Sequence, residues 1–175
     1  MGEYARVTVA ALAIVPGLDS TITFVEQIRG PFSNHLLLPG GRVEFGEELV
    51  EAARREALEE AGCVLGDLSL TGVYEMRGPW ARGDYHVVMF AFQAEQPAVV
   101  PEGFHGDVGK IVQVPWDTVR PHPTVMRILN DAGVADYPAA DIETALAADR
   151  IAMTCHPFSL AGVGSSPSSL VPGRL

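Results

Sequence analysis

The sequence predicts an α/β fold in which a mixed β-sheet lies between helices, with one helix on each face. Residues 47–61 are almost all good helix formers, and Gly62 follows them at a position where helices end. Residues 123–132 predict a second helix, with Pro123 near its first position. Runs rich in β-branched and apolar residues surround both helices and predict strands. Periodicity alone leaves α/β and α+β open.

The predicted strands lie before and after the first helix, over residues 6–15, 21–28, 35–38, 68–76, 85–94 and 110–114. Pro39-Gly40-Gly41 predicts a turn, because proline fixes φ, while glycine permits positive φ and close approach of the backbone to another group. We expect one domain over residues 1–134. A helical extension over 135–155 and a tail over 156–175, rich in Gly, Ser and Pro, would follow it.

The chain is acidic and 47% of its residues are hydrophobic, which is enough for one core in 175 residues. A formal net charge of −10 argues against binding to nucleic acid or to anionic membranes. The first residues lack the basic start of a signal peptide, and no apolar run approaches the length of a membrane span. Cys63 and Cys155 show no metal-ligand spacing and are interpreted as reduced thiols. We therefore expect a cytoplasmic protein.

The first helix places acids beside its apolar face. The stripe predicted to be buried consists of Leu49, Val50, Ala53, Ala57 and Ala61. Glu60 falls within this stripe, Glu56 lies at its edge, and Glu59 lies farther to the side. A solvated face is the usual interpretation of an acidic helix, and it suits Glu51 and Arg54. It does not suit Glu60, because a carboxylate turned toward a core must be paired, protonated or bound to a metal.

Three carboxylates within one helical turn repel one another. A hard divalent cation such as Mg²⁺, which prefers oxygen ligands, would convert this repulsion into attraction. Mn²⁺ accepts the same ligands and is the alternative. An acidic protein would also repel a nucleotide, so a bound metal would have to supply the attraction for such a substrate.

The stretch from Gly41 to Cys63 resembles the Nudix box, G-x5-E-x7-R-E-U-x-E-E-x-G-U, in which U is a bulky aliphatic residue. The match runs through Gly41, Glu47 and the segment Arg55-Glu56-Ala57-Leu58-Glu59-Glu60-Ala61-Gly62-Cys63. All fixed letters are present at the correct spacing, and the two departures are the small Ala57 and Cys63 at hydrophobic letters. The resemblance implies the Nudix fold, an α/β/α sandwich with a mixed central sheet, over about residues 6–130.

The resemblance also implies an activity, which is the Mg²⁺-dependent attack of water on a phosphorus of a nucleoside diphosphate linked to another moiety, X. Glu56 and Glu60 are expected to be the metal ligands because they are the two acids closest to the buried stripe. The carbonyl of Gly40 is a further candidate ligand, since a glycine turn lets a backbone oxygen approach the ion. Glu59 is expected to bind a second metal or to take a proton from the attacking water. Arg55 is expected to orient the glutamates, and a surface ion pair is the alternative for it.

Candidate substrate-binding residues lie outside the box. Arg42 lies just after the glycines, and the loop from Arg77 to Asp84 combines arginines with Trp80. Trp80 would stack on a base while Arg77 or Arg82 contacts phosphate; an ordinary hairpin loop with a packed tryptophan is the alternative.

A second loop, over residues 95–109, holds Glu102, His105 and Asp107. Nudix-like enzymes often draw an additional acid from such a loop as metal ligand or base, which Glu102 or Asp107 could supply. His105 is a candidate acid, base or leaving-group contact, because imidazole titrates near neutral pH. Solvated loop residues are the alternative for all three.

The substrate expected first is a nucleoside triphosphate, including an oxidised or otherwise damaged one. ADP-ribose or a nucleotide sugar is the alternative, in part because many such enzymes are homodimers and the C-terminal extension could serve a dimer. A nucleotide-binding regulator without catalysis is the third reading. The presence of Glu56, Glu59, Glu60 and Arg55 together favours an enzyme over that reading.

Overall fold

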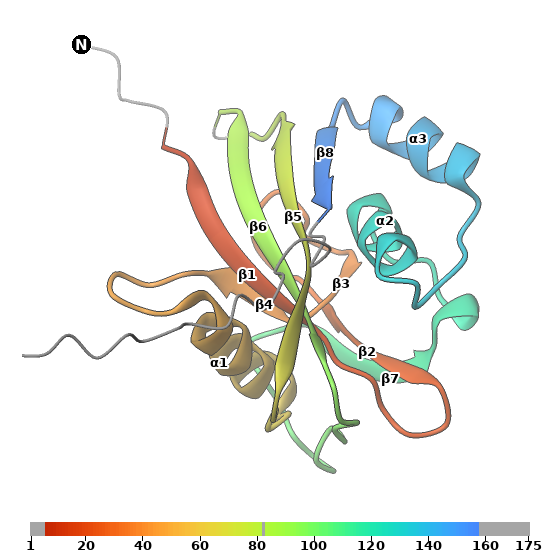
Figure 1. Ribbon diagram of the computed structural model, residues 1–175. Helices are drawn as coiled ribbons and strands as arrows, with labels where there is room; N and C mark the ends of the chain where they lie inside the picture. The colour runs from red at the N-terminus through yellow and green to blue at the C-terminus, as the bar shows by residue number, and fades with distance from the viewer. Residues whose placement is uncertain (1–5, 82, 158–175) are drawn as a thin grey trace, which may run out of the picture.

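The computed structural model describes residues 6–81 and 83–157. A five-stranded sheet in the order β4-β1-β6-β5-β8 crosses the molecule, with α1 on one face and α2 and α3 on the other (Figure 1). β1 and β6 are parallel and the other pairs of this sheet are antiparallel, so the sheet is mixed. Its strands are β1 (Thr8–Ile14), β4 (Gly40–Arg42), β5 (Leu68–Gly78), β6 (Tyr85–Ala94) and β8 (Ala152–Pro157). The predicted α/β sandwich is confirmed.

A second, three-stranded antiparallel sheet was not predicted. It has the order β3-β2-β7, from β3 (Leu36–Leu37), β2 (Thr21–Glu26) and β7 (Lys110–Pro115). β1 and β2 are not neighbours in either sheet; an isolated bridge between Pro16 and Ile22 joins the chain just after β1 to β2, beside a turn in which Asp19 and Ser20 have positive φ. The chain therefore leaves the first sheet after β1, and the strands predicted as one sheet are divided between two.

Helix α1 (Leu49–Ala61) packs closely on the sheet because the residues that it buries completely have small side chains. Its fully buried residues are Ala52, Ala53, Ala57 and Ala61, and they meet Ala11 and Ala13 of β1. Three residues of the predicted stripe are thus buried as expected, whereas Leu49 and Val50 are only half-buried and Ala52 replaces them. The small Ala57 and Cys63 are completely buried, so their size suits this close helix–sheet contact.

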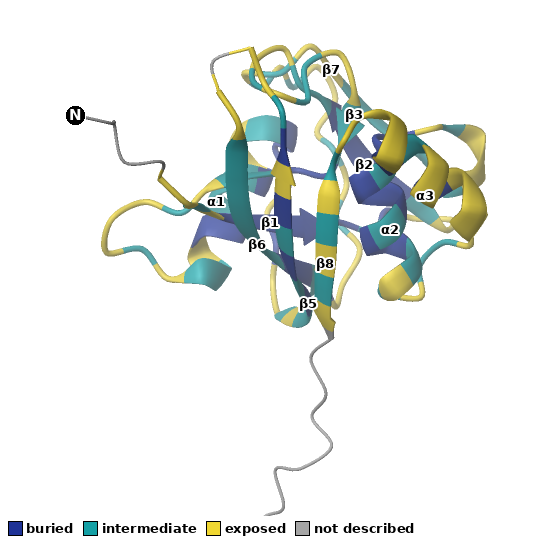
Figure 2. Cartoon of the chain, turned by 90° about the horizontal axis from the view of Figure 1, so that it is seen from above, coloured by how far each residue is buried: buried dark blue, intermediate teal, exposed yellow. Residues whose placement is uncertain are grey.

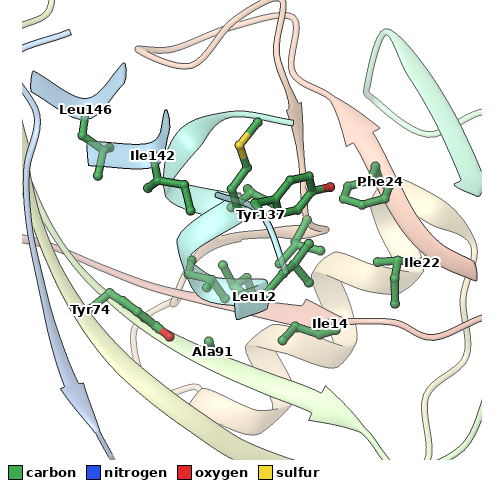
Figure 3. Close-up of a cluster of buried hydrophobic side chains, with 14 residues drawn as sticks. Leu12, Ile14, Ile22, Phe24, Tyr74, Ala91, Tyr137, Ile142 and Leu146 are labelled. Atoms are coloured by element: carbon green, nitrogen blue, oxygen red, sulfur yellow. The ribbon is translucent and has the colours of Figure 1, made fainter. Parts of the chain in front are cut away.

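The opposite face of β1 belongs to a second core. Figure 3 shows this cluster, which contains Leu12, Ile14, Ile22, Phe24, Tyr74, Ala91, Tyr137, Ile142 and Leu146. Alternation along β1 sends Leu12 and Ile14 to this core and Ala11 and Ala13 toward α1. Helix α2 (Pro123–Asp131) closes the core, and α3 (Ala139–Ala148) adds only two buried residues to it. Figure 2 accordingly shows dark inner sides on β1, α1 and α2, and a mostly exposed α3.

The C-terminal extension differs from the prediction. Residues 135–155 contain α3 as expected, but strand β8 follows it and pairs with the edge of β5 from Gly72 to Arg77. Met153 and Cys155 of β8 pack against the second core, which gives this short segment a buried side. Residues 156 and 157, assigned to the tail by the sequence, belong to β8, and the rest of the predicted tail lies outside the described residues.

Within the described ranges, no helix combines the length and the apolar character needed to cross a bilayer.

His122, which caps α2, is a buried titratable group of this core. Its Nδ1 accepts a hydrogen bond from the backbone N–H of Thr124 at 3.3 Å and lies 2.8 Å from the hydroxyl oxygen of Thr124. The side chain is buried, with 3% of the residue exposed, and this desolvation together with nearby His35 lowers the pKa of His122 from 6.5 to about 4.

We expect the His122→Asn variant to lose part of the acid sensitivity of the fold. The unfolded chain binds a proton at His122 below about pH 6.5 and the folded protein only below about 4, so stability falls as the pH drops through this window, by about 3 kcal/mol. Asparagine supplies a capping oxygen in place of the Nδ1 acceptor and does not titrate. Urea unfolding of both proteins between pH 4 and 7 would measure the difference. An unchanged pH slope in the variant would contradict the assignment.

Candidate active site

Glu60 is held from two sides at the C-terminal end of α1. One carboxylate oxygen, Oε1, accepts from Nε2 of Gln27 at 2.8 Å, and Oε2 accepts from the backbone N–H of Gly40 at 3.0 Å. Burial raises the pKa of Glu60 to about 7, and the negative charges of Glu56 and Glu59 also raise it. The two hydrogen bonds lower this pKa, but their effect is smaller than that of burial. Glu60 is therefore the turned-in acid that the helical pattern predicted.

Arg55 forms hydrogen bonds to the other three acids of the box, Glu47, Glu56 and Glu59. Its guanidinium binds both oxygens of Glu47, at 2.8 and 3.1 Å, and donates to Oε1 of Glu56 at 2.9 Å and Oε2 of Glu59 at 3.1 Å. It also donates to the carbonyl of Arg42 at 3.0 Å, which ties α1 to β4. The side chain of Arg55 is only 25% exposed, so this is a partly desolvated network rather than a surface pair.

The two acids nearest the core differ from the third. The side chain of Glu56 is 13% exposed, and its burial raises its pKa despite the contact with Arg55. The side chain of Glu59 is 59% exposed. We call Glu56 and Glu60 the inward pair, because both face the interior, whereas Glu59 faces solvent. The helical periodicity of the sequence predicted this arrangement.

The predicted glycine turn is instead the short strand β4. Gly40 and Gly41 do not have positive φ; they pair with Leu12 and Ala11 of β1. The expected close approach is present. A Cβ on Gly40 would lie 2.5 Å from Cβ of Leu12, and one on Gly41 would lie 2.3 Å from Oε1 of Glu56. These glycines are required by space rather than by backbone conformation.

We expect Gly41→Ala to weaken Mn²⁺ binding by about tenfold without unfolding the protein, because the added methyl must displace the Glu56 carboxylate. Mn²⁺ titration followed by water proton relaxation would measure this. Gly66→Ala is the matched control, since Gly66 has open space around a built Cβ and no positive φ. Equal Mn²⁺ affinities for Gly41→Ala and the wild type would show that the close approach is unimportant for the site.

The inward pair faces a cavity of about 640 Å³. Its polar lining, from α1, β4 and the loop after β2, includes Gln27, Arg29, Arg42, Glu56 and Glu60. Its apolar lining comes mainly from the loop after β2, from β5 and β6 and from α2, and includes Phe32, Met76, Trp80, Tyr85, Met89 and Ile128. Phe32 packs edge-to-face on Tyr85, with ring centroids 5.4 Å apart. Carboxylates, arginines and an aromatic wall therefore share one cavity.

Among the substrate-binding candidates, the cavity includes Arg42 and Trp80 but not Arg77. Trp80 is 37% exposed, and Arg77 lies on the surface of β5, where its guanidinium pairs with Glu75. Arg82, the other phosphate candidate of this loop, lies outside the described residues. The structure thus brings Trp80 to the cavity and leaves Arg77 outside it.

Asp107 is the loop acid that the structure brings to the glutamates. A smaller cavity of about 220 Å³ is lined by Asp107 together with Gln27, Arg29, Glu56, Glu59 and Glu60. The loop lies tightly against the end of α1, since a Cβ on Gly106 would lie 2.4 Å from the carbonyl oxygen of Glu60. Glu102 and His105 are exposed and line neither of these two cavities.

The carboxylates of this site suit a metal ion whose remaining ligands come from water and from the substrate. In the part of the chain that the structure describes, no three His, Cys, Asp or Glu side chains are arranged to hold an ion by themselves. The inward pair offers two half-buried carboxylates beside a cavity. Mg²⁺ is commonly bound by one or two carboxylates, with water and substrate phosphates completing its octahedron. The residues present therefore fit Mg²⁺ or Mn²⁺ in this role.

Sequence reasoning missed the residues that reach the site from distant segments. Gln27 lies 33 positions from Glu60, and Phe32, Met76, Tyr85 and Met89 join the cavity only through the packing of loops and strands. None belongs to the box, and no local pattern distinguishes them from ordinary strand or loop residues.

Comparison with known proteins identifies a family for this chain. The NUDIX domain family matches residues 5–128. The chain is 39% identical over 74 residues to an ADP-ribose pyrophosphatase of Methanocaldococcus jannaschii, covering 42% of this chain and 43% of that protein. It is 32% identical over 77 residues to the 8-oxo-dGDP phosphatase NUDT18 of Mus musculus, covering 44% of this chain and 24% of that protein. The chain thus spans less than half the length of these curated relatives.

The fold agrees with a solved structure as well. A NUDIX hydrolase from Nitrosomonas europaea superposes with a TM-score of 0.54 at 25% identity, covering 78% of this chain and 95% of that one. The family match extends over most of the chain and contains the acids of α1, both glycines of β4 and the cavity around them. The chain belongs to the Nudix hydrolase family.

Proposed function

We propose that this protein hydrolyses the pyrophosphate linkage of a nucleoside diphosphate joined to another moiety, X, with Mg²⁺ as the cofactor. The observation that carries the proposal is the inward pair, Glu56 and Glu60, half-buried on the wall of a 640 Å³ cavity that also has an aromatic lining. Burying two carboxylates together costs free energy unless a cation binds them. A pyrophosphate needs such a cation to approach an acidic protein.

In this proposal Glu56 and Glu60 hold the metal, and the Gly40 carbonyl remains a candidate ligand. When bound, the metal neutralises phosphate oxygens and so stabilises the charge that develops during attack by water. Arg55 keeps Glu56 and Glu59 in place through the hydrogen bonds described above. Glu59 is assigned either to proton removal from water or to a second metal, and Asp107 could assist it from the smaller cavity.

The nucleoside is proposed to occupy the apolar part of the cavity. Phe32, Trp80 and Tyr85 offer faces and edges for a base, and the methionines give an adaptable wall. Arg42 is the nearest cation from β4 for a phosphate, and Arg29 is a further candidate. A nucleoside triphosphate, including an oxidised one, is the first candidate substrate, and the mouse relative's name is consistent with damaged nucleotides.

ADP-ribose or a nucleotide sugar is the second candidate. It is favoured by the archaeal relative named as an ADP-ribose pyrophosphatase, with 39% identity over the matched segment. A homodimer and a cytoplasmic location remain predictions that accompany either substrate; light scattering of the purified protein would test the dimer.

A substrate panel tests the proposal. Purified protein with Mg²⁺ would be incubated with standard and oxidised nucleoside triphosphates, ADP-ribose, nucleotide sugars and dinucleoside polyphosphates, in ¹⁸O-water. Product masses identify the phosphorus that water attacks. We expect metal-dependent turnover of at least one class. Tight binding of one nucleotide without turnover at Mg²⁺ or Mn²⁺ would contradict hydrolysis and favour the regulatory reading.

A further inference from the structure

The hairpin between β2 and β3 places one polar side chain against the inward pair. Gln27 begins this hairpin, and its backbone is fixed there: its N–H donates to the carbonyl of His35 at 3.1 Å, and its carbonyl accepts from the N–H of Asn34 at 2.7 Å. Both backbone groups are therefore occupied. The side chain is left to extend toward α1, where its Nε2 reaches Oε1 of Glu60 at 2.8 Å.

We propose that Gln27 is a positioning residue that holds Glu60 in the orientation needed for metal binding. This inference rests on the proposed function. Gln27 lies outside the box and donates to Oε1 of Glu60, whereas the Gly40 N–H donates to Oε2, so the two donors fix both oxygens of one carboxylate. Each carboxylate oxygen has a second lone pair, which stays available to an ion.

The geometry explains why a neutral amide suits this position. Arg55 donates to Glu47, Glu56 and Glu59. Among the residues that the structure describes, the hydrogen-bond donors to Glu60 are neutral, the Gln27 amide and the Gly40 N–H. A cation at residue 27 would compete with the metal for Glu60, whereas an apolar side chain would leave Oε1 without a donor. A glutamine donates one hydrogen bond and adds no charge. It orients the ligand while leaving its charge for the ion.

Gln27 also connects the carboxylate to the nucleoside part of the cavity. The hairpin loop that it opens carries Arg29, Pro31 and Phe32, all of which line the larger cavity. Gln27 itself lines both cavities beside the inward pair. The same short segment therefore contributes a hydrogen bond to the metal-binding acid and a wall to the substrate cavity.

The test is Mn²⁺ affinity of the full chain, measured by electron paramagnetic resonance without substrate. Gln27→Met keeps the length and shape of the side chain but removes the donor. We expect it to weaken Mn²⁺ binding by about 10- to 100-fold, the usual effect of losing a hydrogen bond to a metal ligand. We also expect the Mg²⁺ concentration needed for hydrolysis to rise by a similar factor, with the rate largely recovered at saturating Mg²⁺.

Gln113→Met is the matched control. Gln113 is another part-buried glutamine, and its Nε2 donates to the Thr23 hydroxyl and the Ala98 carbonyl, each at 2.8 Å, away from both cavities. Its loss should lower stability but leave Mn²⁺ affinity unchanged. Wild-type affinity in folded Gln27→Met would overturn the positioning role and leave the proposed function intact. Absence of Mn²⁺ binding in the wild type would overturn the positioning role, whereas absence of metal-dependent turnover across the substrate panel would overturn the proposed function.

Discussion

Glu60→Gln is expected to reduce hydrolysis by at least about 10³-fold while making the metal-free protein more stable above pH 7. The activity loss follows from removing one of two inward carboxylates, because a catalytic metal contributes several kcal/mol to transition-state stabilisation and about 4 kcal/mol corresponds to about 10³-fold in rate. Steady-state rates at saturating Mg²⁺, for whichever substrate the panel identifies, would measure the loss.

The stability gain follows from the raised pKa of Glu60. The folded protein releases this proton near pH 7 and the unfolded chain near 4.5, so the free energy of unfolding falls as the pH rises between these values, by as much as about 3 kcal/mol. The new amide does not titrate and escapes this loss. His122 acts in the opposite direction over nearly the same range, so the difference between wild type and variant at each pH is the quantity to measure.

These two effects separate a metal site from a structural acid. A variant that is stable but inactive indicates that the carboxylate is retained for binding a cation, at a cost to stability. Adding Mg²⁺ should raise the melting temperature of the wild type and leave that of Glu60→Gln nearly unchanged. Full activity in the variant would contradict the role assigned to Glu60.

Arg55→Met is expected to cost about 2–4 kcal/mol of stability and most of the activity. The guanidinium binds three carboxylates and the carbonyl of Arg42, so its removal takes the positive charge away from all three acids, including the largely buried Glu56. Denaturant unfolding and rates measured on the same samples would show both effects. Because a divalent ion can offset part of the repulsion, Mg²⁺ should recover more stability in this variant than in the wild type.

Arg54→Met supplies the comparison on the same helix. Arg54 binds Glu51 and the carbonyl of Gly66 at the surface, and it does not line either cavity. We expect a loss of about 1 kcal/mol and unchanged activity. Similar losses of activity in the two variants would contradict the role of Arg55 in holding the acids of the site in position.

Local chemistry was sufficient to predict α1 and the order of its acids. The helix formers, Gly62 and the 3.6-residue period placed Glu60 inward, Glu56 at the edge and Glu59 outside, and the structure has them in that order. The sequence correctly predicted that the backbone at Gly40 and Gly41 approaches another group closely, but the predicted turn with positive φ is absent there. Close approach is present at Gly41, but it occurs in a strand, since pairing with β1 supplies hydrogen bonds that a local reading does not include.

What could not be predicted depends on contacts between distant segments. Strand β8 has no strong pattern of its own and is ordered by the open edge of β5. The position of Asp107 rather than Glu102 beside the glutamates depends on how residues 101–107 pack against the end of α1, where a Cβ on Gly106 would lie 2.4 Å from the carbonyl oxygen of Glu60. Gln27 is an ordinary residue at the end of a strand until the hairpin brings it to Glu60.

A crystal soaked in Mn²⁺ and measured at the manganese absorption edge tests the central claim most directly. We expect an anomalous peak between the carboxylates of Glu56 and Glu60, on the side facing the larger cavity, and loss of that peak in Glu60→Gln. A peak bound elsewhere, or none at a Mn²⁺ concentration that supports hydrolysis, would contradict the account.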